Sequence, residues 1–169
     1  MSAKRAGDVR RIWAPWRTRF FYRRGRAPRG CIFCTAVRSR ADRKHLVFRR
    51  SRHAFAILNL YPYNNGHVMI APRRHVADLS ALTDGELVDV WRLVGAVQTQ
   101  ITRLLKAQGF NVGINLGRVA GAGIPGHLHV HLVPRWLGDT NFMPIIGWTK
   151  VISQSLEELH DRLTARTTR

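Results

Sequence analysis

The chain has 169 residues, of which 45% are apolar, and a formal net charge of +18 at pH 7. This length fits one globular domain, and five Trp and seven Phe can fill a single core. No run of about 18 apolar residues occurs, and the first thirty residues contain ten Lys or Arg. We therefore expect neither a signal peptide nor a membrane-spanning helix, and no membrane partner.

The first predicted element is a basic, aromatic-containing N-terminal arm, residues 1–29. Residues 1–52 hold 17 of the 28 Lys and Arg but 2 of the 10 Asp and Glu, so they contribute +15 and the remaining residues +3. Such an arm can hold polyanions, including nucleic acid, by Coulomb attraction. The alternative is a solvated segment that only keeps the protein soluble.

A hairpin is predicted after the arm. The segment 31–52, which begins with two cysteines, is interpreted as a basic linker that follows the Cys pair. Residues 53–58 form an apolar run typical of a buried strand, and residues 67–71 form a second one. Residues 59–66 between them contain Pro and Asn-Asn-Gly, which favour a turn.

The clearest predicted element is a long amphipathic helix. Thr83 and Glu86 have the spacing of a capping box, which marks a helix start. Apolar residues then recur at helical spacing for about six turns, until Gly109 ends the pattern. These residues are Leu87, Val90, Trp91, Val94, Val97, Ile101, Leu104 and Leu105.

Two strands and a short helix complete the predicted fold. Residues 110–115 and 128–133 have strand character, and residues 117–126 between them form a Gly-rich loop. Residues 155–158 open a short final helix. Hairpins with two separate helices, without regular strand and helix alternation, indicate an α+β fold with a mainly antiparallel sheet.

Three histidines stand out in the last predicted strand. His127, His129 and His131 alternate with apolar residues, so all three imidazoles line one face of the strand. Packing alone does not easily satisfy three histidines on one face of an apolar strand. They therefore indicate chemistry, and a plain three-histidine metal site is one alternative, because neutral imidazoles are common zinc ligands.

The pattern resembles the motif of the histidine-triad (HIT) family, His-x-His-x-His followed by two apolar residues. Residues 30–143 look like the family domain, with Cys-x-x-Cys, a hairpin ending in Ala-Pro-Arg-Arg-His, a long helix, and the triad followed by Pro-Arg. The resemblance implies a HIT-like fold with about five strands and a homodimer. We place the HIT domain at 30–152 and the C-terminal helix and tail at 153–169.

The resemblance implies covalent catalysis. In the family the middle histidine, here His129, attacks phosphorus and forms a nucleotidyl-histidine, while His131 would contact the phosphate under attack. A neutral imidazole is a good nucleophile near pH 7 if its other nitrogen is held protonated by an acceptor such as a backbone carbonyl. The predicted nucleotide-binding residues are Asn59, Asn115, Gly121, Gly123, Gly126 and His131.

Asn59 stands where the family places an acidic or amide residue on the ribose hydroxyls. Its alternative role is that of a turn-capping Asn before Pro62. His67 belongs to a Gly-His pair that many relatives share, and we interpret it as structural.

A metal site is the second implied feature. Zinc-containing relatives use a Cys pair, the histidine after the second strand and the first histidine of the triad, which correspond here to Cys31, Cys34, His75 and His127. Two thiolates and two imidazoles suit tetrahedral zinc with a structural role, in a reducing cytoplasmic setting. The alternative is a pair of reduced cysteines without metal. No organic cofactor is expected.

The loop before the triad departs from the small hydrolases of the family. Those carry Gln and Ser or Thr, whereas residues 120–126 read Ala-Gly-Ala-Gly-Ile-Pro-Gly. The tail 134–143 and the leading Trp-Ala-Pro-Trp-Arg at 13–17 look like the bacterial branch that includes diadenosine tetraphosphate phosphorylases. The implied substrate is a dinucleoside polyphosphate, with phosphate or water as acceptor, and the two Trp cover either the core or a base.

Two alternative functions remain at this point. One is a hydrolase of adenosine phosphoramidates or of adenylated nucleic-acid ends, which the basic arm would suit. The other is a binding module for nucleotides or nucleic acid in which the triad has no catalytic role. The intact His129 speaks against the second alternative.

Overall fold

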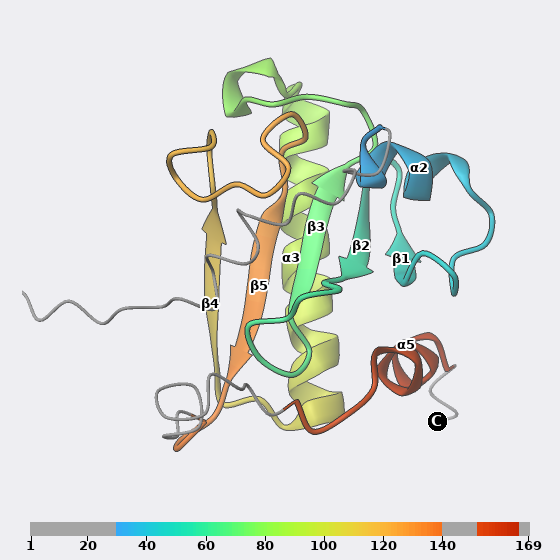
Figure 1. Ribbon diagram of the computed structural model, residues 1–169, viewed down its shortest axis with the longest axis vertical. Coiled ribbons are helices and arrows are strands. Elements are labelled where there is room, and N and C mark those ends of the chain that lie inside the picture. Colours follow the sequence, from blue (N-terminus) through green and yellow to red (C-terminus); the bar gives the residue numbers. More distant parts are fainter. Residues whose placement is uncertain (1–29, 140–151, 166–169) are drawn as a thin grey trace, which may run out of the picture.

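The computed structural model describes residues 30–139 and 152–165. Within them the chain forms a five-stranded antiparallel sheet with the strand order β1-β2-β3-β5-β4 (Figure 1). The strands are β1 (Val47–Arg50), β2 (Ala54–Leu58), β3 (Val68–Pro72), β4 (Gly109–Ile114) and β5 (Val130–Arg135). The α+β fold and the antiparallel sheet are thus confirmed. The predictions for residues 1–29 and 140–143 lie outside the described residues.

Helices cover the sheet from different sides. They are α2 (Ile32–Arg38), α3 (Asp84–Leu105) and α5 (Leu156–Thr164), with a 3-10 turn η2 (Leu79–Ala81) before α3. The long helix α3 crosses one face of the sheet and packs on β2, β3 and β5, while α5 packs on β1 (Figure 1). Among the described residues, no helix has both the length and the apolar character needed to cross a bilayer.

Strand alternation produces two apolar clusters. Val68, Ile70 and Leu132 pack with α3 on one face, whereas Phe55 and Met69 belong to a cluster with α2 on the other. The second face also carries the histidines described below. Both clusters follow from the period of two along a strand. One cluster packs the sheet against α3 and the other packs it against α2.

The predicted capping box of α3 is confirmed. Thr83 Oγ1 accepts a hydrogen bond from the Glu86 N–H at 3.3 Å, and a Glu86 carboxylate oxygen accepts one from the Thr83 N–H at 3.0 Å. The same carboxylate pairs with Arg74 at 2.6 Å, and this guanidinium is the largest cause that lowers the pKa of Glu86 to about 2. The start of α3 is therefore fixed both locally and by the loop after β3.

Replacing Thr83 by Ala leaves an N–H of the first helical turn without its side-chain acceptor. We expect the free energy of unfolding to fall by about 1 kcal/mol and the melting temperature to fall by about 2–4 °C. Thr102→Ala is the matched control, because Thr102 is exposed on the same helix and its hydroxyl donates to Gln98 O within that helix. Equal melting temperatures for the two variants would contradict a stabilising cap.

The segment that follows the Cys pair, through Arg52, was predicted as a basic linker, and this prediction is wrong. It contains the second half of α2 and all of β1, which tertiary contacts hold in place. The Arg50 guanidinium donates to the carbonyl oxygens of Ala36 at 2.8 Å and Ser39 at 3.1 Å, and it pairs with Asp42 at 2.6 Å. The Arg50 side chain thus fixes the C-terminal end of α2 and the loop after it to β1.

Two smaller predictions need correction. Trp91 and Leu87, predicted in the buried stripe of α3, are 47% and 39% exposed. Trp91 is exposed because it lies about 100° around the helix from the buried Val90. The strand that carries the histidines begins at Val130, not at residue 128. Only His131 of the triad therefore lies within a strand.

Candidate active site and metal centre

The triad enters the sheet at the start of β5. His127 and His129 lie in the segment that leads into β5 and are 0% and 4% exposed, while His131 is half-buried. The rings of His129 and His131 lie 4.8 Å apart. Val130 and Leu132 point into the core under α3, so the predicted alternation of histidine and apolar residues is confirmed.

His129 is held in one tautomer. Its Nδ1–H donates to the backbone carbonyl of His127 at 2.7 Å, as the sequence-based expectation required. Because a carbonyl oxygen can only accept, Nδ1 carries the proton and Nε2 of the neutral ring carries a lone pair. Burial lowers the pKa of His129, and the hydrogen bond to the carbonyl partly offsets this shift. The geometry therefore favours a neutral imidazole.

A second histidine controls the tautomer of His131. The Tyr63 backbone N–H donates to His67 Nδ1 at 3.0 Å, so His67 Nε2 carries the proton of its neutral ring. His67 Nε2 lies 3.0 Å from His131 Nδ1 and donates to it. His131 Nδ1 is therefore an acceptor, and its proton sits on Nε2.

His131 is therefore a neutral ring whose Nε2–H can donate a hydrogen bond. Burial, and secondly the repulsion that a protonated His131 would meet from a protonated His129, lower the pKa of His131 to about 4. His67 was interpreted as structural, but its contact with His131 makes it part of the site. The tight Gly66-His67 turn was the only sequence signal, since it places a histidine at the start of a strand. At φ +74° only Gly suits position 66, where a Cβ would also meet Leu105 Cδ1 at 2.7 Å.

A cavity of about 430 Å³ lies beside His131. It runs along β4 and β5, and Asn115 is among its lining residues. At the far end Arg135 pairs with Asp139 at 2.6 Å and donates to Asn111 Oδ1 at 2.8 Å. Two of the predicted nucleotide-binding residues, Asn115 and His131, are thus brought to one cavity.

Asn59 has other partners. Its Oδ1 accepts a hydrogen bond from the Tyr61 N–H at 2.9 Å, and its Nδ2 lies 3.2 Å from His67 Nδ1. The side chain therefore caps the turn after β2 and supports the ring that orients His131. Its ribose contact stays a prediction.

The three glycines of the loop that were predicted to bind the nucleotide differ in their hydrogen bonds. The Gly121 N–H donates to Arg118 O at 3.0 Å, which closes a turn inside the loop. Gly123 and Gly126 are exposed, and their N–H groups make no hydrogen bond within the described part of the chain. These two amides could bind an anion beside the triad.

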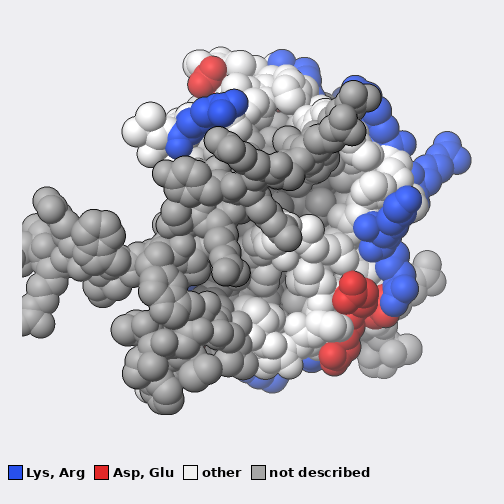
Figure 2. Space-filling model, in the orientation of Figure 1, with Lys and Arg blue, Asp and Glu red and all other residues white. Residues whose placement is uncertain are grey.

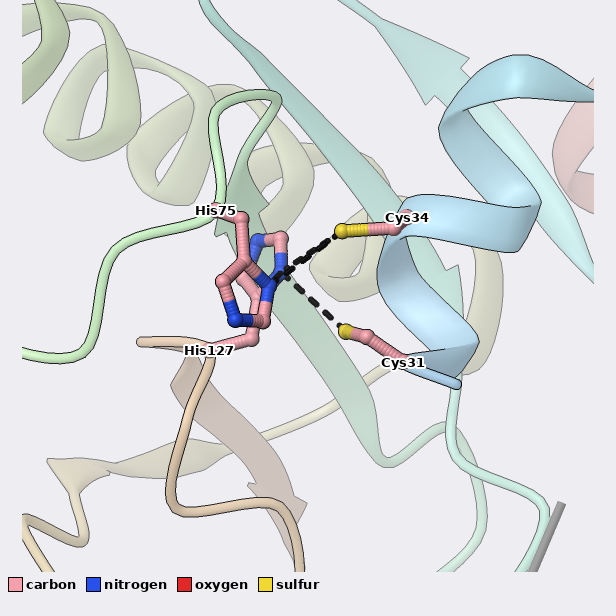
Figure 3. A group of neighbouring side chains, drawn as sticks. All are labelled: Cys31, Cys34, His75 and His127. Atoms are coloured by element: carbon pink, nitrogen blue, oxygen red, sulfur yellow. Dashed lines mark hydrogen bonds between the residues drawn. The ribbon is translucent and has the colours of Figure 1, made fainter. Parts of the chain in front are cut away.

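The predicted metal ligands form one cluster (Figure 3). One ligand atom from each of Cys31, Cys34, His75 and His127 lies within 4.8 Å of the others. His127 Nδ1 lies 3.3 Å from Cys31 Sγ and 3.2 Å from His75 Nδ1. Cys34 Sγ lies 3.3 Å from His75 Nδ1, so both sulfurs and both nitrogens face a common centre.

The chemistry of this donor set fits a divalent metal. His127 Nε2–H donates to Pro72 O at 2.9 Å, which leaves Nδ1 of the neutral ring unprotonated and directed at the two sulfurs. Burial lowers the pKa of His127, which further favours the neutral, ligating form. Two sulfurs and two imidazole nitrogens match a tetrahedral zinc site without an open position.

Charge is unevenly distributed around the domain. On the face drawn in Figure 2 the described Lys and Arg lie around the rim, most of them along one side beside a smaller acidic group. Residues 38–52 contribute to the basic surface, although Arg43 pairs with Asp161 at 2.8 Å and Arg50 pairs with Asp42. The described domain is therefore itself basic, in addition to the N-terminal arm.

Sequence comparisons agree with this site. A family model for the HIT domain matches residues 40–136. The AP-4-A phosphorylase of Mycobacterium tuberculosis is 40% identical over 157 residues, which cover 89% of this chain and 80% of that protein. The asymmetrical bis(5'-nucleosyl)-tetraphosphatase of Schizosaccharomyces pombe is 41% identical over 93 residues, which cover 55% of this chain and 50% of that protein.

Solved structures give the same result. A hypothetical histidine triad nucleotide-binding protein from Sulfolobus tokodaii has a TM-score of 0.63 and 28% identity, covering 79% of this chain and 89% of that chain. A Zn-bound histidine triad family protein from Mycobacterium smegmatis has a TM-score of 0.58 and 25% identity, covering 80% and 91% of the two chains. Because the triad is present and the family model matches more than half of this chain, the chain belongs to the HIT family.

Proposed function

We propose that this chain cleaves dinucleoside polyphosphates, such as diadenosine tetraphosphate, through a covalent nucleotidyl-histidine on His129. The observation that carries the proposal is the hydrogen bond from His129 Nδ1–H to the His127 carbonyl, which leaves Nε2 as a free lone pair. The neighbouring His131 supplies a proton on Nε2 that can stabilise charge on the phosphoryl oxygen.

The proposed reaction has two steps. In the first, His129 Nε2 attacks the α-phosphorus, a P–N bond forms, a P–O bond breaks, and the leaving nucleotide departs on the bridging oxygen. In the second, the acceptor attacks the same phosphorus, the P–N bond breaks, and His129 regains its lone pair. The exposed amides of Gly123 and Gly126 would bind the phosphoryl oxygens in both steps.

The acceptor can be phosphate or water, and the products distinguish them. With diadenosine tetraphosphate, phosphate yields ADP and ATP, whereas water yields AMP and ATP. The relationship to AP-4-A phosphorylase favours phosphate, which we propose as the acceptor. Chromatography of the products with and without phosphate tests this choice: AMP formed at an unchanged rate in phosphate would contradict it.

We propose a structural zinc ion on Cys31, Cys34, His75 and His127. The ion would neutralise the thiolates and join the N-terminal end of α2 to the segment that precedes β5. Because this donor set leaves no open position, the ion would take no part in the reaction. The proposed biological unit is a homodimer.

A second candidate is the removal of adenylate from nucleic-acid ends. The basic residues around the rim of the domain favour it, because they could hold a phosphate backbone (Figure 2). Competition between an adenylated oligonucleotide and diadenosine tetraphosphate in one assay would rank the two substrates.

His67→Phe should lower turnover without unfolding the protein. The change keeps an aromatic ring beside Tyr63, whose own ring stacks on His67 at 4.7 Å, but it removes the donor to His131 Nδ1. His131 can then adopt either tautomer, so we expect kcat to fall by about 10–100-fold, as for other residues that orient a catalytic imidazole. An unchanged kcat, measured with the melting temperature as a control for folding, would remove His67 from the mechanism.

A further inference from the structure

Phe33 lies between the two cysteines and contacts two histidines with different roles. Its side chain is 0% exposed. Its ring centroid lies 5.0 Å from that of His127, a predicted metal ligand, and 4.9 Å from that of His129, the proposed nucleophile. A single aromatic ring therefore touches both the metal cluster and the proposed active site.

The position of Phe33 depends on how α2 is held. This helix has seven residues and begins after Cys31, its N-cap, whose side chain makes no capping hydrogen bond. Arg50 fixes its C-terminal end through the carbonyls of Ala36 and Ser39. A metal bound to the sulfurs of Cys31 and Cys34, which lie directly on either side of Phe33, would hold the N-terminal end.

The ring of His129 needs such a neighbour. Its Nδ1–H bond to the His127 carbonyl fixes one edge of the ring, but the terminal torsion of a histidine is broad. The ring can therefore tilt about that hydrogen bond unless its face is packed. Among the described residues, the ring contacts of His129 are with Phe33 and with the edge-on ring of His131.

We propose that Phe33 is a positioning residue that sets the tilt of the His129 ring, and that metal binding by Cys31 and Cys34 holds Phe33 in place. The metal site would thus control the orientation of the His129 ring without taking part in the reaction. This inference rests on the proposed function of His129, but two of its tests use the resting protein and need no turnover.

The test compares Phe33→Leu with Phe55→Leu. Phe55 is equally buried in the same cluster, and its ring centroid lies 6.2 Å from that of Phe33. Replacing Phe55 therefore removes a similar volume from the same core. Phe33→Leu should lower the single-turnover rate of nucleotidyl transfer by about 10–100-fold and change KM by less than about twofold, because misplaced reactants lose rate rather than binding. Phe55→Leu should leave the rate within about twofold. Equal losses of rate in both variants would overturn the proposal, as would a change in KM alone for Phe33→Leu, which would instead make Phe33 a ligand contact.

An NMR measurement distinguishes a change in the orientation of the His129 ring from a loss of protein stability. In protein labelled with ¹⁵N at histidine, the hydrogen-bonded Nδ1–H of His129 should give a sharp imidazole N–H resonance, assigned by its absence in His129→Asn. We expect Phe33→Leu to broaden or shift this resonance and Phe55→Leu to preserve it. Phe33→Met, which keeps more of the volume, provides a second variant if Phe33→Leu does not fold.

Metal exchange completes the test. Replacing zinc by cadmium, a larger ion, should shift the His129 resonance in the unaltered protein but not in Phe33→Leu, where the connection is missing. Equal shifts in both proteins, or none in the unaltered protein, would overturn the proposed link. If the link holds but His129→Ala retains turnover, the proposed function fails while the structural connection stands.

Discussion

His129→Ala should abolish turnover of diadenosine tetraphosphate while the protein stays folded. The substitution removes Nε2, the proposed nucleophilic atom, so no covalent intermediate can form. Loss of a nucleophile from a site that otherwise still binds substrate lowers kcat steeply, and we expect at least about a 10⁴-fold decrease. Steady-state product formation, with nucleotide binding measured by calorimetry, checks both parts of the expectation.

A matched control for this variant is His45→Ala. His45 is half-buried and lies outside both the cavity lining and the metal cluster. Its replacement should leave turnover within about twofold. Turnover by His129→Ala at a rate near that of His45→Ala would mean that another group attacks phosphorus.

The second large effect concerns the metal cluster. Cys34→Ser replaces a sulfur that lies 3.3 Å from His75 Nδ1 and 3.7 Å from His127 Nδ1. Because a metal that binds the folded state stabilises it by mass action, we expect loss of bound zinc and about 3 kcal/mol of stability, or about 6–12 °C in melting temperature. Metal analysis of the purified protein and thermal unfolding measure the two quantities.

Thr35→Ala is the control for the metal variant. Thr35 follows Cys34 on α2, is exposed, and its hydroxyl donates to Cys31 O at 3.1 Å without facing the cluster. This variant should keep one zinc per chain. Stoichiometric zinc in Cys34→Ser, or a melting temperature that a chelator does not change in the unaltered protein, would contradict a structural metal.

The parts of the fold with strong periodic patterns could be predicted from the sequence. The helix α3 has a capping box and an apolar stripe, and the β2–β3 hairpin has two apolar runs around a turn, so local preference and final packing agree. The four predicted metal ligands lie together in the structure, although they come from three separate segments. Here the resemblance to a family supplied what spacing alone could not.

Other features could not be predicted because tertiary contacts create them. The elements α2 and β1 have seven and four residues, too short for a periodic signal, and Arg50 holds them together through backbone carbonyls. The contact of His67 with His131 could not be predicted from the sequence, since the two residues are 64 positions apart. Likewise the Gly121 amide serves the loop's own turn, which composition does not reveal.

The most direct test of the central claim is to trap the intermediate. The enzyme, mixed with diadenosine tetraphosphate and quenched during the first turnover, is analysed by intact mass and then by peptide mapping. We expect one added adenylyl group, carried by the peptide that contains His129 and labile in acid, as a phosphoramidate should be. A rapid release of product with no adduct at any time, or an adduct on a different residue, would contradict it.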